Sequence, residues 1–128
     1  MSPDVHAELN SQKALSLHIT LRSNVDKSVA LYKYLLPWGN RNSIILIAVA
    51  SDGRHLERTV GIDDPSPEQV IIEPGKSLSG DIDLYKRFAG LQTALKKSDI
   101  LLFWAYRSPA DLRVAEWSGG WILLPQHK

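Results

Sequence analysis

The residues of this chain that could do chemistry begin with its four histidines, His6, His18, His55 and His127. A zinc site needs three or four converging ligands, often two residues apart on a strand or four apart on a helix. None of these histidines is so spaced. We therefore predict ordinary surface histidines and no bound metal or other cofactor.

Two pairs of carboxylates are the next candidates. Asp81 and Asp83 would project from the same face of an expected strand, which is the spacing for bridging a hard cation, whereas Asp63-Asp64 precedes a proline and suits a turn. Calcium requires six to eight converging oxygen atoms, and these separate pairs do not supply them. Asp81 and Asp83 also occupy the solvent side of that strand, where charge is ordinary.

Nucleophilic catalysis has no recognisable motif. A serine nucleophile needs a base and a strained elbow such as Gly-Xaa-Ser-Xaa-Gly, which Ser118-Gly119-Gly120 does not provide. The chain contains no cysteine, so disulfides and thiolate chemistry are excluded. We predict a protein that is not an enzyme. A small hydrolase, the remaining catalytic alternative, would require histidine and aspartate to converge in the folded chain.

Four tryptophans are many for 128 residues. Trp104 alternates with apolar residues and is expected in the core. Exposed loop aromatics are typical anchors for protein partners, and they also serve as stacking platforms for sugars; the alternative is that they cap the open ends of the fold. Trp38 lies in an expected loop, and two others flank an expected Gly-Gly hinge. The predicted partner-binding residues are Trp38, Asn40, Arg41, Trp117 and Trp121.

The elements that position these residues include two segments that are apolar at every position, 44–50 and 100–106. A half-exposed strand alternates apolar and polar residues, because successive side chains point to opposite faces of the sheet. Segments that do not alternate need cover on both faces. We expect a second sheet on one face, and a helix, a terminus or a partner on the other.

The rest of the pattern is also mostly strand. Further strands are expected at 15–21, 29–36, 56–60, 70–72, 78–84, 112–117 and 121–124. Between 85 and 97 the period changes, and the apolar residues Leu84, Phe88, Leu91 and Leu95 predict one or two helical turns. The sequence predicts an all-β, antiparallel β-sandwich of seven to nine strands with one short helix in a crossover.

Length and charge narrow the class of protein. A chain of 128 residues makes one domain, which we place at 13–128 behind a flexible arm at 1–12. The net charge of +1 offers no concentrated basic patch for nucleic acid or an anionic membrane. No leader-like or membrane-spanning segment is visible, so we expect a cytoplasmic protein.

The turn motifs carry a resemblance. These motifs are Arg22-Ser23-Asn24-Val25-Asp26-Lys27-Ser28-Val29, Pro37-Trp38, Ser51-Asp52-Gly53-Arg54, Ile72-Glu73-Pro74-Gly75-Lys76-Ser77-Leu78 and Asp81-Ile82-Asp83-Leu84-Tyr85. Over residues 15–85 they resemble bacterial immunoglobulin-like β-sandwich domains, some of which inhibit proteases or accompany them as accessory domains. The resemblance implies an immunoglobulin-like fold and a protein partner, including a protease. It carries over no functional residue.

The expected function is therefore non-catalytic protein binding, with protease inhibition or an accessory role as its forms. A homodimer through a sheet face is a separate hypothesis. If the helix at 85–97 leaves the outer faces of 44–50 and 100–106 uncovered, Ile45, Ile47, Leu101 and Phe103, or the residues that alternate with them, would form a patch that monomers rarely expose. The alternative function is a carbohydrate-binding module that uses exposed tryptophans.

Overall fold

Strands dominate the chain, and all their pairings are antiparallel. The computed structural model describes residues 5–10, 15–39, 43–59, 68–109, 112 and 116–127. The strands are β1 Val5–Asn10, β2 Ser16–Arg22, β3 Val29–Tyr32, β4 Ile45–Ala50, β5 Gln69–Ile72, β6 Ser77–Asp83, β7 Ile100–Arg107 and β8 Trp117–Leu124. A 3-10 turn, Lys33–Leu35, and the helices α1 Leu84–Arg87 and α2 Leu91–Leu95 complete the described elements.

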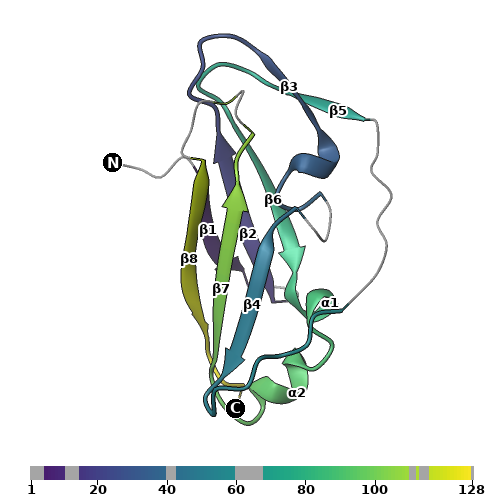
Figure 1. Cartoon of the computed structure of the whole chain (residues 1–128), viewed down its shortest axis with the longest axis vertical. Helices are drawn as coiled ribbons and strands as arrows, with labels where there is room; N and C mark the ends of the chain where they lie inside the picture. Colours follow the sequence, from purple (N-terminus) through teal and green to yellow (C-terminus); the bar gives the residue numbers. More distant parts are fainter. Residues whose placement is uncertain are drawn as a thin grey trace.

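The strands form three hydrogen-bonded groups. Two have three strands each, in the orders β1-β2-β6 and β4-β7-β8, and β3 pairs with β5 in a small ribbon. Figure 1 shows β4, β7 and β8 in front of β1, β2 and β6, with the ribbon at the upper end and both helices at the lower end. The helices therefore close one end of the molecule and leave the front of β4-β7-β8 uncovered.

The core lies between the two three-stranded groups and follows from alternation within each strand. On β2, Leu17, Ile19 and Leu21 are buried, while the residues between them are partly exposed. On β7, Leu102 and Trp104 are buried in the same way. Each fully buried large apolar side chain contributes about 1.5–3 kcal/mol, so this shared interior stabilises both groups. The predicted core position of Trp104 is confirmed.

The helical pattern also behaves as predicted. Leu84, Phe88, Leu91 and Leu95 are all fully buried. The helix is split, however, because the chain leaves helical geometry at Phe88 and restarts after Gly90. Two short turns place this apolar stripe under the open lower end of the core.

The N-terminal residues depart from the expected flexible arm. Residues 5–10 form β1, which pairs with β2 from Val5 opposite Leu21 to Asn10 opposite Ser16. Val5 is only 2% exposed. The segment alternates apolar and polar residues as a half-buried strand should, and long-range pairing with β2 supplies the hydrogen bonds.

Two predicted strands differ from the structure. The strand expected at 29–36 ends at Tyr32, where the 3-10 turn begins. No strand occurs in the described part of 56–60. The Leu56 amide donates to the Ala48 carbonyl and the Thr59 amide to the Arg87 carbonyl, and the preceding His55 makes a single bridge to Val49.

From Trp117 to Leu124 the chain is one continuous strand without the expected hinge, while the strand expected at 112–117 lies partly outside the described residues. Gly119 and Gly120 pair with Ala105 and Trp104 in the middle of β8. A Cβ atom on Gly119 would lie 2.7 Å from the Trp104 carbonyl oxygen, and one on Gly120 would lie 3.3 Å from the Trp104 Nε1. These glycines therefore make room for Trp104 and its strand, and they do not mark a break.

Among the described residues, no helix has the length and apolar character needed to span a membrane.

Candidate interaction surface

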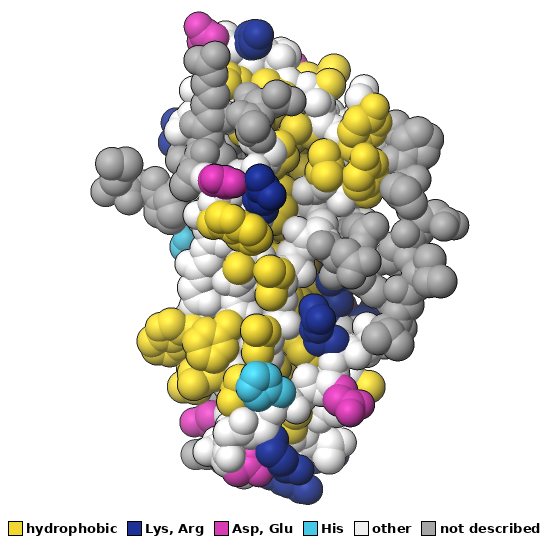
Figure 2. All heavy atoms as spheres, in the orientation of Figure 1, with side chains coloured by type: hydrophobic (Ala, Val, Ile, Leu, Met, Phe, Trp, Pro, Cys, Tyr) yellow, Lys and Arg dark blue, Asp and Glu magenta, His cyan; other side chains and the backbone are white. Residues whose placement is uncertain are grey.

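The outer face of β4-β7-β8 is apolar across all three strands. The strand register aligns its outward residues in rows: Val49, Leu101 and Leu123; then Ile47, Phe103 and Trp121; then Ile45, Ala105 and Gly119; and last Arg107 with Trp117. We call this surface the apolar face. In Figure 2, which has the orientation of Figure 1, hydrophobic side chains gather along the front of these strands.

The apolar face is well exposed to solvent. Its seven large hydrophobic side chains, Ile45, Ile47, Leu101, Phe103, Trp117, Trp121 and Leu123, are between 37% and 65% exposed. Isolated exposed apolar side chains are ordinary, whereas contiguous exposed groups of this extent are typical of interaction sites in general. Among the outward residues of these strands only Arg107 is charged, and its guanidinium lies 3.0 Å from the Glu116 carboxylate.

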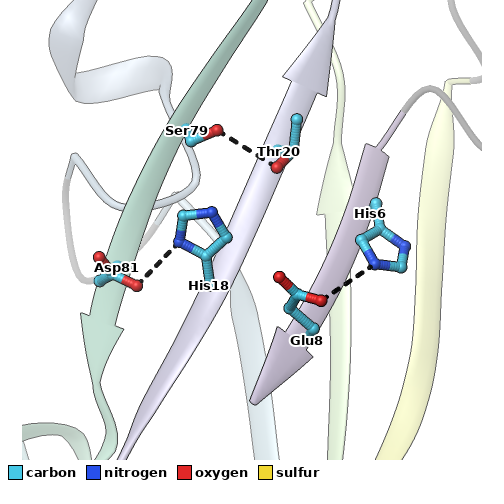
Figure 3. A network of polar contacts seen from close by, with 6 residues as sticks. All are labelled: His6, Glu8, His18, Thr20, Ser79 and Asp81. Atoms are coloured by element: carbon cyan, nitrogen blue, oxygen red, sulfur yellow. Dashed lines mark hydrogen bonds and ion pairs between the residues drawn. The ribbon is translucent and has the colours of Figure 1, made fainter. Parts of the chain in front are cut away.

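The outer face of β1-β2-β6 has the opposite character. Figure 3 shows three polar contacts on it: His18 Nδ1 lies 2.9 Å from Asp81 Oδ1, Thr20 is hydrogen-bonded to Ser79 at 3.2 Å, and His6 lies 3.8 Å from Glu8. The register places Glu8, His18 and Asp81 in one row across the three strands. We call this surface the polar face, and it is the solvated face expected of a half-buried sheet.

The predicted carboxylate pair has separate structural roles. Asp81 binds His18, while Asp83 caps α1 by accepting hydrogen bonds from the Tyr85 and Lys86 amides at 3.0 and 3.3 Å. Within the described residues no three histidine or acidic side chains cluster as metal ligands would.

Trp38 lies elsewhere and serves packing. It is half-buried in the turn that follows the 3-10 helix, and its indole occupies the space where a Cβ on Gly80 would be. Because Gly80 pairs with the buried Ile19, this is the core side of β6. Trp38 is therefore directed toward the interior and away from the apolar face.

Trp38 also lines a hollow of about 520 Å³, together with Lys33, Leu36, Gly39, Val70, Leu78 and Ser79. The Lys33 ammonium lies 2.6 Å from the Glu68 carboxylate. That hydrogen bond and, to a smaller extent, the positive charge of Lys33 lower the pKa of the Glu68 carboxyl group. The lysine on this lining is therefore already in an ion pair.

The structure thus separates the predicted binding residues. Trp117 and Trp121 are exposed on the apolar face, Trp38 packs against β6, and Asn40 and Arg41 lie outside the described residues. The sequence did not indicate that Trp117 and Trp121 share one surface with Phe103 and Ile47. The alternation of 117–123 was the available signal, and interpreting Gly119-Gly120 as a hinge concealed it.

Comparison of the chain with protein-family models and with curated proteins finds no match.

Proposed function

We propose that this chain is an immunoglobulin-like β-sandwich domain that binds another protein, without catalysis, through the apolar face. One observation carries the proposal: two sheets of one small molecule have outer faces of opposite character. If both outer faces of the domain were always in contact with water, an apolar outer face would not stabilise it, because exposed apolar groups lack the favourable free energy of burial.

The strand order supports the sandwich. In immunoglobulin-like domains the strands conventionally lettered A, B and E share one sheet, and C, F and G share the other. With the β3-β5 ribbon set aside, the six remaining strands have this arrangement, as β1-β2-β6 and β4-β7-β8. The facing apolar interiors of the two groups are what such a packing requires.

The chemistry of the apolar face favours binding over reaction. It offers aromatic and branched aliphatic side chains, and Arg107, its charged member in the described strands, is in an ion pair. Tryptophan and phenylalanine bury large areas at low entropic cost and dominate binding free energies at interfaces. Protease inhibition and an accessory role to a protease are the two forms of this function that the resemblance suggests.

The test is affinity capture from the native cell extract. Wild-type protein, a Trp117→Ala/Trp121→Ala variant and a matched polar-face variant, His6→Ala/Thr20→Ala, serve as baits. We expect one partner to be recovered by the wild type and the polar-face variant and lost from the tryptophan variant. Equal recovery by all three baits would contradict the proposed site. Adding the captured protease, if the partner is one, to a peptide-cleavage assay then separates inhibition from an accessory role.

Carbohydrate binding is the second candidate, and a specific observation favours it. Trp117 and Trp121 are 54% and 65% exposed and project from the same side of one strand. Calorimetric titration with a panel of soluble oligosaccharides tests it. Binding heat that disappears in Trp121→Ala would support sugar recognition, and no heat from any member would exclude the tested glycans.

A further inference from the structure

We propose that the partner at the apolar face is a second copy of this chain, packed sheet against sheet about a two-fold axis. The inference rests on the proposed function, since it uses the same face, and it names the occupant. Three properties of the face carry it: its area, its relief and its distribution of charge.

The area is what a stable dimer needs. From their exposed fractions, the seven large side chains present roughly 500–800 Å² of surface, if about 150–250 Å² is taken for each whole side chain. The largest apolar patch on a monomer is about 300–600 Å², and a stable interface buries about 800 Å² on each partner. The face therefore lies at or above the upper end of the usual monomer patch and approaches the size of one half of a stable interface.

The relief of the face is self-complementary. The row of Ile47, Phe103 and Trp121 forms a ridge, and the next row, Ile45, Ala105 and Gly119, is low on two of its three strands. Trp117 rises again beyond it. In a two-fold contact, residue i of one copy meets residue j of the other and the reverse. Each ridge can then enter the low row of the other copy.

The charges do not oppose this contact. Arg107 lies at one end of the face and is already paired with Glu116. Charged residues are depleted at interface centres and are accommodated in the polar rim. Two copies can therefore meet without bringing like charges together at the centre and without leaving a buried charge unpaired.

The experiment is sedimentation equilibrium of the intact chain over a wide range of concentrations. We expect the wild type to be a dimer whose thermal unfolding midpoint rises with concentration. Phe103→Asp places a charge on the ridge, and we expect it to raise the dimer dissociation constant at least 100-fold, which shifts the chain toward the monomer. Trp121→Arg is a second such variant, so that misfolding of one does not remove the test. Ser77→Asp adds the same charge as Phe103→Asp to an exposed position at the start of β6, and we expect it to remain dimeric.

Two results would overturn the second-copy assignment. One is a single-chain mass for the wild type at every concentration; the other is a dimer that persists in both face variants while they retain the wild-type circular dichroism spectrum. Neither result decides the proposed protein-binding function, which depends on the capture experiment. Conversely, a dimer that is lost in both face variants supports the inference even if no other protein is captured.

Discussion

At the scale of single residues, Gly80 and Trp38 show how a missing side chain can be a packing element. Gly80 lies among inward-facing positions of β6, opposite Ile19. Any Cβ there would overlap the Trp38 indole. The turn at 37–39 is thereby fixed against the core by a tryptophan that fills the space the glycine leaves.

Replacing Gly80 by alanine should therefore destabilise the fold. We expect Gly80→Ala to lower the free energy of unfolding by about 1–3 kcal/mol, the usual cost of overpacking a core. Denaturant titration measures it. Ser77→Ala, at an exposed position of the same strand, is the matched control and should stay within about 0.5 kcal/mol of the wild type. Equal effects of the two changes would contradict the packing role of Trp38.

Tyr106 gives the fold a dependence on alkaline pH. Its hydroxyl donates to the Leu35 carbonyl at 2.6 Å, and burial raises the pKa of Tyr106 above its ordinary value. The folded protein keeps this proton above pH 10, while the unfolded chain releases it. Stability from this group is therefore fully present below pH 10 and falls by about 1.4 kcal/mol per pH unit above it.

The variant Tyr106→Phe isolates this effect. At pH 7 it should be about 1 kcal/mol less stable than the wild type, because one hydrogen bond is lost and the Leu35 carbonyl keeps no partner from this side chain. The difference should shrink above pH 10 and vanish near pH 11. A difference in unfolding free energy that stays constant from pH 7 to 11 would show that Tyr106 does not titrate with folding.

At the scale of elements, α1 depends on a single cap. The Asp83 side chain accepts hydrogen bonds from two amides at the start of α1, and that helix holds Leu84 in the core. We expect Asp83→Ala to cost about 1 kcal/mol and Asp83→Asn to retain most of the stability.

The control for the cap is the neighbouring aspartate on β6. Asp81 forms an exposed pair with His18, so Asp81→Ala should change the unfolding free energy by less than about 1 kcal/mol. If Asp81→Ala costs more than Asp83→Ala in chemical denaturation, the assigned capping role is wrong.

Local pattern accounts for the elements that the sequence predicted. Alternation identified β2, the all-apolar runs identified β4 and β7, and the step of three and four identified the helical stripe from Leu84 to Leu95. These features depend on residues close together in the chain. Cover on both faces was expected for β4 and β7, but Ile45, Ile47, Leu101 and Phe103 are exposed on the outer side of these strands.

What the sequence did not predict depends on distant partners. β1 forms because it pairs with β2. β8 contains two glycines in its middle because atoms of Trp104 on the neighbouring strand leave little room for side chains there. The rows of the apolar face likewise require the register of three strands, in which residues of one row, such as Ile47 and Trp121, lie 74 positions apart in the chain. Trp117 and Trp121 were recognised as exposed aromatics, but their shared row positions with Arg107 and Phe103 could not be read from local pattern.

At the scale of the whole molecule, β1 belongs to the cooperative unit. Its inward residues Val5, Ala7 and Leu9 pack against the core. Removing residues 1–10 would uncover the edge of β2 and the apolar surface beneath these side chains. We expect the truncated chain to lose at least about 2 kcal/mol of stability, since burial of Val5 alone is worth about 1.5 kcal/mol or more. Thermal unfolding measures this loss, and an unchanged midpoint would show that β1 contributes nothing to the fold.

The division of the four tryptophans between inside and outside has an optical consequence. Trp104 is buried and Trp38 half-buried, whereas Trp117 and Trp121 project into solvent. Iodide should quench the fluorescence of the outer pair, Trp117 and Trp121, more than that of the inner pair, Trp38 and Trp104. The intrinsic fluorescence therefore reports separately on the surface and on the interior. Unfolding shifts the inner signal to longer wavelength. If the outer pair becomes protected from iodide while the signal of the inner pair does not change, the apolar face is covered and the fold is intact.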